Sequence, residues 1–145
     1  MPPTGSRTDP YLGFNFLVEI DGITQAGFQE VSGLDASTDS VDYREGTDPN
    51  HVRKLSGLNK FSPLTLKRGI TDTDELWKWR QTVMDGKTER KNGSIVLLDD
   101  TGAEKIRWNF SNAWPTKWTG PSFNSTSTAV AIETLEITHE ELKRA

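Results

Sequence analysis

The sequence has no cysteine, only two histidines and no long apolar run. Without cysteine there can be no disulfide, no thiolate nucleophile and no cysteine-ligated metal centre. The longest run of large aliphatic residues is Ile95–Leu98, whereas a membrane-spanning helix needs about 20 apolar residues. Met1–Arg7 lacks the apolar segment of a secretory signal, so we expect none there. These absences exclude thiol-dependent enzymes, disulfide-stapled domains and helical membrane proteins.

Core-forming residues and basic charge are also scarce. Leu, Ile, Val and Phe make up 32 of 145 residues, just above the roughly 20% level below which chains are disordered. The net charge of −4 is unlike the basic footprint of a general nucleic-acid binder. Ser and Thr number 28, and 17 of these are Thr, which favours strands over helices. The length fits one domain, and we expect its thin core to be completed by neighbouring copies.

The clearest strand signal lies near the start of the chain. Phe14–Ile20 alternates between apolar and polar residues, which places Phe14 and Phe16 on the core face. Asp21-Gly22 is a turn dipeptide, and Gly27–Val31 is a second predicted strand. The short connection predicts that the two strands form a hairpin. We expect residues 1–8 to be a flexible arm and residues 9–145 to form a single domain.

The segment Leu34–Leu58 is poor in core residues and is predicted to project from the domain. Its middle, Glu45–Asn50, has the composition of a loop. Val52–Leu55 can pair back on the strand before this loop. Such a hairpin rarely offsets its own ordering entropy, so we expect it to pack on another chain.

One helix is predicted over residues 73–85. Leu76 and Trp79 lie three residues apart on its apolar stripe. Asp72 begins a capping pattern, and Gly86 is placed to end the helix.

Strand signals also surround the helix. Trp108 and Phe110 share one face of an alternating segment, and Leu135 belongs to the longest predicted strand. We interpret Glu140–Ala145 as a charged tail. The whole pattern predicts a mainly β fold, an antiparallel barrel or sandwich carrying one helix. The predicted strands here are Leu64–Arg68, Ser94–Leu98, Lys105–Ser111, Trp114–Trp118 and Ala129–His139.

The residues give no support for catalysis. His51 stands in a polar loop, and Glu136 and His139 have a di-iron spacing that only a helix would place on one face. Nucleophile-elbow, P-loop and dinucleotide motifs are absent. We therefore predict no enzyme activity, no catalytic or metal site and no cofactor. The five Trp residues leave open a soluble aromatic-rich module that binds carbohydrate or single-stranded nucleic acid.

A series of motifs, in order along residues 9–142, resembles the inner-tube (tail-tube) proteins of contractile phage tails and related contractile injection systems. Each motif is weak alone, and their order makes the resemblance specific. They are Asp9–Tyr11, Ala26–Leu34, Tyr43–Gly46, Arg53–Leu58, Leu64–Gly69, Leu76–Trp79, Trp108–Pro115, Lys117–Pro121, Glu133–Glu136 and His139-Glu140.

This resemblance implies a structural role. Members of the family form hexameric rings that stack into a rigid hollow tube, with two packed sheets and a flanking helix in each subunit. A surrounding sheath drives the tube through a target envelope, and baseplate or spike-hub proteins meet its end. The lumen carries DNA or effector proteins. The chain would be made and assembled in the bacterial cytoplasm and would not insert in a membrane.

The resemblance also places subunit and ring-stacking contacts on the projecting segment and the strand after it. Whether the particle is a phage tail or an extracellular, membrane-anchored or cytoplasmic injection system stays open. So does the choice between a main tube subunit and an adaptor ring near the baseplate. The predicted contact residues are Tyr43, Arg44, Glu45, Arg53, Lys54, Leu55, Lys67 and Arg68.

Overall fold

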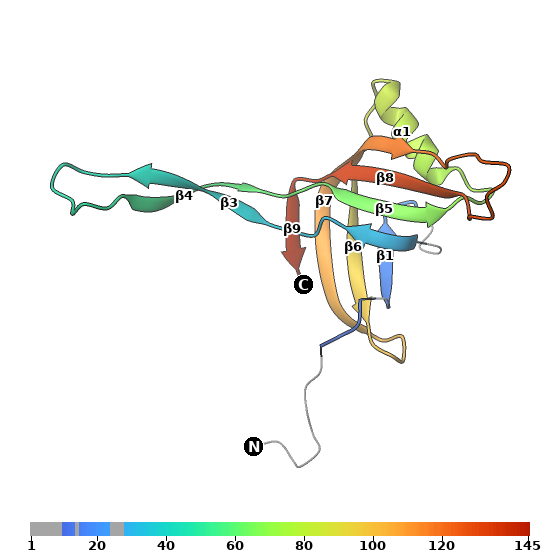
Figure 1. Ribbon diagram of the computed structural model, residues 1–145, viewed down its shortest axis with the longest axis horizontal. Coiled ribbons are helices and arrows are strands. Elements are labelled where there is room, and N and C mark those ends of the chain that lie inside the picture. Colours follow the sequence, from blue (N-terminus) through green and yellow to red (C-terminus); the bar gives the residue numbers. More distant parts are fainter. Residues whose placement is uncertain (1–9, 14, 24–27) are drawn as a thin grey trace, which may run out of the picture.

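A computed structural model describes residues 10–13, 15–23 and 28–145. The predicted flexible arm of residues 1–8 and the predicted core residue Phe14 lie outside the described residues. The described chain forms nine strands and one helix (Figure 1). They are β1 (Phe16–Ile20), β2 (Phe28–Ser32), β3 (Ser37–Tyr43), β4 (Arg53–Lys60), β5 (Leu64–Gly69), α1 (Glu75–Met84), β6 (Lys91–Leu98), β7 (Glu104–Thr119), β8 (Ile132–Thr138) and β9 (Glu141–Arg144).

Seven of the strands form one antiparallel assembly that folds over itself. Its order is β1-β6-β7-β8-β5-β2, and β9 pairs with β7 beside this path. The long strand β7 joins the two halves, since it pairs with β6 up to Ala113 and with β8 from Trp114 onward. At the change of partner the register shifts, and Asn112 has a φ of 54°, as a β-bulge that bends a strand does.

The two halves pack face to face as a sandwich. The first half consists of β1, β6, β9 and the start of β7, and the second of β2, β5, β8 and the end of β7. The strands do not close into a barrel, since β1 and β2 end the path. The predicted fold class, mainly antiparallel β with one helix and an extended arm, is confirmed.

The core lies between the two halves and under α1. Four residues expected in the core, Leu76, Trp79, Phe110 and Leu135, are buried. Phe16 packs half-buried against this cluster, and Trp108 is also half-buried. Burying a large apolar side chain contributes about 1.5–3 kcal/mol. The buried residues Val18, Ile20, Leu64, Leu66, Ile95, Ala113 and Ile137 complete the cluster.

The helix closes one end of the sandwich. Its N-cap is Asp74 and not the predicted Asp72, and the Asp74 side chain makes no capping hydrogen bond. Gly86 ends the helix with a φ of 76°, so its predicted position after the last turn is confirmed. The indole nitrogen Nε1 of Trp79 donates to the carbonyl oxygen of Glu89 at 2.8 Å, which ties the helix to the segment before β6.

Two local predictions were wrong. β1 and β2 do not form a hairpin, because β1 pairs with β6 and β2 pairs with β5. The predicted charged tail contains the strand β9, which pairs with β7. Leu142 packs against the core while the charged residues around it remain exposed, so one apolar residue and backbone pairing hold the strand.

Candidate subunit-assembly site

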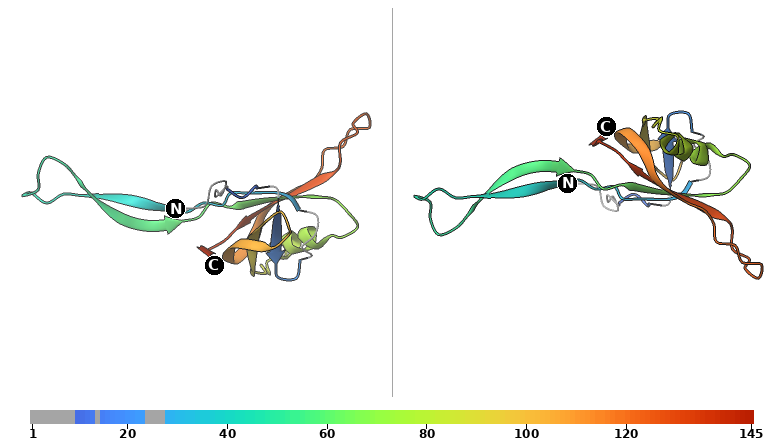
Figure 2. Two further views of the ribbon diagram at one scale, coloured as in Figure 1. Left: turned by 90° about the horizontal axis from the view of Figure 1, so that it is seen from below. Right: turned by 90° about the horizontal axis from the view of Figure 1, so that it is seen from above.

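The strands β3 and β4 form a two-stranded arm that extends far from the sandwich (Figures 1 and 2). Every residue of β3 is exposed, and in β4 only Gly57 is half-buried. A lone two-stranded ribbon is at best marginally stable in water. The predicted projecting hairpin is therefore present, and the described residues leave both of its faces open.

The two faces of the arm differ in chemistry. Val41 and Leu55 are directly paired across the strands, and Tyr43 follows on the same face. These three side chains are between 43% and 47% exposed. The opposite face carries the paired residues Asp42 and Lys54, which form an ion pair. The arm thus offers an unpartnered apolar face backed by a polar one.

The tip of the arm is held together by its own charged residues. The guanidinium of Arg44 donates to the carbonyl oxygens of Pro49, at 3.2 Å, and Asp48, at 3.0 Å. The Asp48 carboxylate accepts from the Glu45 backbone amide at 2.8 Å and pairs with Arg53 at 2.6 Å. Three predicted contact residues, Arg44, Glu45 and Arg53, therefore shape the tip itself.

At the root of the arm, the two segments that connect it to the sandwich are held to each other by hydrogen bonds between Asp35 and Ser62, which we call the polar clasp. The Asp35 carboxylate accepts from the backbone amide of Ser62 at 2.9 Å and from its hydroxyl at 2.6 Å. These hydrogen bonds, the hydroxyl first, lower the pKa of Asp35. Next to the clasp, Gly33 has a φ of 96°, and a Cβ there would lie 2.1 Å from the Pro63 carbonyl oxygen. The arm can leave the sandwich at this point because Gly33 carries no side chain.

The two predicted contact residues on β5 point in opposite directions. Lys67 lies on the outer face and pairs with Glu30 of β2 at 3.4 Å. Arg68 lies inside the sandwich, where it meets Glu133 at 3.1 Å. The side chain of Arg68 is only 5% exposed, so its guanidinium is bound within this chain, and its place at or near a subunit contact stays a prediction. Alternation along a strand places neighbours on opposite faces.

The outer face of β2, β5, β8 and the end of β7 is polar. Leu64, Leu66, Leu135 and Ile137 point into the core, so the residues between them on these strands point outward. The register aligns the outward side chains of the four strands in two rows, which we call the polar face. One row is Ser32, Thr65, Glu136 and Lys117, and the other is Glu30, Lys67, Thr134 and Thr119.

The aromatic residues do not build a stacking platform in the described chain. Trp79 is buried, and the indole nitrogen of Trp118 donates to Glu133 at 3.1 Å. Trp77 is 41% exposed and contacts Trp118 edge-on, with ring centroids 4.9 Å apart. Nothing in this arrangement favours the carbohydrate or nucleic-acid binding module.

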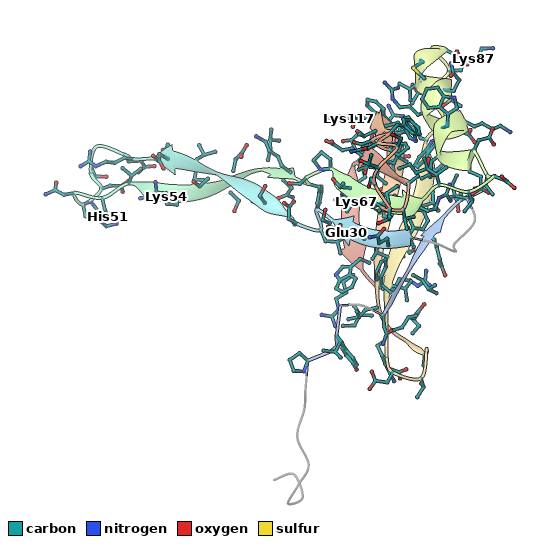
Figure 3. All side chains as sticks on the ribbon, turned by 45° about the vertical axis from the view of Figure 1, so that its right-hand side comes forward. Glu30, His51, Lys54, Lys67, Lys87 and Lys117 are labelled. Carbon is teal, nitrogen blue, oxygen red and sulfur yellow. The ribbon has the colours of Figure 1, made fainter. Side chains whose placement is uncertain are left out.

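The two histidines do not form a metal site in the described part of the chain either. His51 lies at the arm tip (Figure 3). His139 is buried between the rings of Phe61 and Phe110, with centroids 5.6 Å and 6.0 Å away. Among the described residues, no group of three or more potential metal ligands comes together.

Comparison with known proteins decides the family. Residues 12–143 match the family described as T4-like virus tail tube protein gp19. The chain belongs to this tail tube family. The match spans the arm, the sandwich and the helix.

Solved structures place the chain among the tubes of contractile injection systems. It is 31% identical to a chain of the sheath–tube complex of an extracellular contractile injection system, PVC, in the extended state. That alignment covers 94% of this chain and 91% of the other, with a TM-score of 0.84. A chain of the anti-feeding prophage cap is 28% identical over 97% of this chain and 93% of that one, with a TM-score of 0.86.

More distant structures share the fold alone. Hcp1 from Flavobacterium johnsoniae is 20% identical over 90% of this chain and 94% of its own, with a TM-score of 0.59. No functionally curated protein matches the chain by sequence. In the described part of the chain, no helix is long and apolar enough to cross a membrane.

Sequence reasoning missed the polar face as a unit. Its signal is present in β5 and β8, where Thr, Lys and Glu alternate with buried Leu and Ile. What the sequence does not show is that these strands are neighbours, or that β2 and β7 extend the same two rows. The exposed arm could be predicted without such long-range information, because its segment is poor in core residues.

Proposed function

We propose that this tail tube protein forms hexameric rings that stack into a rigid hollow conduit inside a contractile sheath. The observation that carries the proposal is the arm, a ribbon whose apolar face is left uncovered by the part of the chain that the structure describes. In a ring or stack, a neighbouring copy would cover Val41, Tyr43 and Leu55. The expected contacts on the arm's polar face, at its tip and on β5 are Lys54, Arg44, Glu45, Arg53 and Lys67.

The end strands of the sandwich support ring closure. β1 and β2 each pair with one described strand, so each leaves a free edge. Exposed edges are an aggregation hazard, and pairing between subunits around a ring removes them. A ring closes by such head-to-tail contacts, whereas stacking is the open-ended contact that lengthens a tube.

The partners follow from this architecture. The related PVC structure is a sheath–tube complex, and a chain 24% identical belongs to an anti-feeding prophage baseplate. We propose a sheath around this tube, a baseplate or spike-hub at its end and cargo in its lumen. The subunit is made and assembled in the bacterial cytoplasm and acts without catalysis.

Negative-stain electron microscopy of the purified protein over a range of concentrations tests the proposal. We expect six-fold rings and hollow stacks whose length grows with protein concentration. Sedimentation of the same samples separates rings from monomers. A protein that stays monomeric at every concentration would refute the proposed assembly.

A further inference from the structure

His139 lies at the corner where the chain passes from β8 to β9. These two strands belong to different halves of the sandwich, so the corner stands at the junction between the halves. Beside it β7 bends at Asn112, and the backbone amide of Glu140 donates to the carbonyl oxygen of Ser111 at 3.0 Å. His139 is only 7% exposed, although it is a polar residue at a corner of the chain.

The ring of His139 contacts the root of the arm. Phe61 belongs to the segment that returns from the arm to β5, and its ring centroid lies 5.6 Å from that of His139. Phe110, from the core, lies 6.0 Å from the same ring. Ser62, the next residue after Phe61, is the donor of the polar clasp. In Figure 1 the corner between β8 and β9 is correspondingly beside the start of the arm. A movement of the His139 ring would therefore reach the clasp through a single residue.

Both nitrogens of this ring are buried without a partner. Neither Nδ1 nor Nε2 of His139 has a hydrogen-bond partner among the described residues. A neutral imidazole carries one N–H group, whereas the protonated ring carries two and a positive charge. Burying a cation without hydrogen-bond partners costs far more free energy than burying the neutral ring. The surroundings of His139 therefore fit the neutral ring and not the cation.

The charged groups near His139 do not offset this cost. Asp35 is close enough to interact: the Ser62 hydroxyl and amide lower the pKa of Asp35 first, and the charge of His139 adds the smallest contribution. Asp35 is exposed, however, and both of its oxygens accept from Ser62, so solvent screens its attraction for the ring. The charged residues that flank His139 and Phe61 in the chain pair elsewhere: Glu140 with Arg90 at 3.2 Å, Glu141 with Lys143 at 2.8 Å and Lys60 with Asp39 at 3.0 Å.

We propose that His139 is a pH-sensitive switch for the root of the arm. At neutral pH the uncharged ring fills the junction and holds Phe61, and with it the clasp, in place. In mild acid a proton from solvent turns the ring into a cation, which leaves the junction for water. Histidine is the side chain that changes charge in this range, and protons favour the released state because they bind it more readily than the buried one. The arm then loses its fixed direction relative to the sandwich.

The chain suits a direct test because it has only two histidines. His51 is exposed at the arm tip, so His51→Gln leaves one histidine ring signal, that of His139. In the dilute, unassembled subunit, nuclear magnetic resonance follows this signal and the Ser62 amide from pH 8 to pH 5. Both should change with the same midpoint, and exchange of the Ser62 amide, corrected for its intrinsic dependence on pH, should rise at least about tenfold. A ring that titrates without any change at Ser62, or that does not titrate in this range, would overturn the switch.

Two substitutions separate His139 from Asp35. His139→Phe keeps an aromatic ring and removes the protonation site, so exchange of the Ser62 amide should rise less than about twofold over the same pH range. His139→Leu repeats the test if the first variant fails to fold. Asp35→Asn weakens the clasp at every pH but should keep the rise, because the pKa of Asp35 is lowered to below this range. A tenfold rise that persists without His139 would overturn the proposal.

The consequence for assembly rests on the proposed tube function. The yield of sedimenting tubes should fall at least about fivefold between pH 7.5 and pH 5.5, whereas His139→Phe should give equal yields at both. Equal yields from the unmodified chain would overturn the extension of the switch to assembly. Failure to form tubes at any pH would instead count against the proposed function, while the result at the Ser62 amide would stand, so the two failures are distinguishable.

Discussion

Arg68 and Glu133 face each other inside the sandwich, as direct partners in the register of β5 and β8. The guanidinium donates to Oε1 of Glu133 from Nη2 at 3.1 Å and from Nε at 3.3 Å. The other carboxylate oxygen accepts from the indole of Trp118 at 3.1 Å. Arg68 also lies over the ring of Phe28, 5.4 Å from its centroid. One buried ion pair therefore links β2, β5, β7 and β8.

Removing one partner of this pair should destabilise the subunit strongly. Glu133→Leu leaves the Arg68 charge buried, and among the described residues Glu75, at 3.5 Å, is the carboxylate that still pairs with it. We expect the free energy of unfolding to fall by about 3–5 kcal/mol, measured by urea denaturation. The double variant Arg68→Met/Glu133→Leu should recover most of this loss, because no charge remains buried. Glu136→Gln, on the same strand but on the outer face, is the control and should change stability by less than about 0.5 kcal/mol.

Making the apolar face of the arm polar should affect assembly and not folding. Val41 and Leu55 are exposed in the chain, so Val41→Ser/Leu55→Ser should leave the subunit's unfolding midpoint nearly unchanged. The yield of sedimenting tubes should fall at least about tenfold, since an apolar contact between subunits is lost. Ser40→Thr/Ser56→Thr alters the directly paired residues of the opposite face and should assemble normally. Equal yields from both variants would exclude the apolar face as a contact.

Reversing the charge of Arg44 should disturb the arm tip first. The substitution Arg44→Glu removes the hydrogen bonds to the carbonyl oxygens of Pro49 and Asp48 and adds an anion beside the Asp48 carboxylate. We expect faster amide exchange in residues 45–50 of the unassembled subunit, together with shorter or fewer tubes by electron microscopy. Tubes of unchanged length and number would remove Arg44 from the set of contacts.

The β6–β7 hairpin should respond to acid through Asp99. Its carboxylate accepts hydrogen bonds from the hydroxyl and amide of Thr101 and from the amide of Ala103. These bonds, the hydroxyl first, lower the pKa of Asp99 from 3.8 to about 2. Because the folded pKa is depressed, the stabilisation is complete above the unfolded value near 3.8 and is lost as pH falls through about 2.

Nuclear magnetic resonance can follow this titration. The Thr101 and Ala103 amide shifts should change with a midpoint near pH 2, and Asp99→Ala should abolish that change at every pH. A midpoint at the ordinary aspartate value would contradict the hydrogen-bonded geometry of the turn.

The sequence predicts the elements of this fold better than their pairing. The helix follows from the spacing of Leu76 and Trp79, and the arm follows from the shortage of core residues between Leu34 and Leu58. The pairing of β1 with β6 joins residues more than 70 positions apart. No local turn signal encodes such a contact, so the nearby turn at Asp21-Gly22 favoured the wrong partner.

For the candidate site too, the features with a local sequence signal could be predicted, whereas those that depend on contacts between distant strands could not. The arm and its tip could be predicted because their composition is locally unusual. The inward direction of Arg68 and the outward direction of Lys67 depend on which face of β5 is covered, and that is decided by the other half of the sandwich. β9 was missed because its one apolar residue, the half-buried Leu142, stands among charged residues.

Cryo-electron microscopy of the assembled protein shows directly whether its subunits form a hollow tube through their arms. We expect hollow six-fold rings in which the arm of each subunit is seated on a neighbour through Val41, Tyr43 and Leu55. Assemblies without a lumen, or tubes in which the arms stay free in solvent, would contradict this expectation.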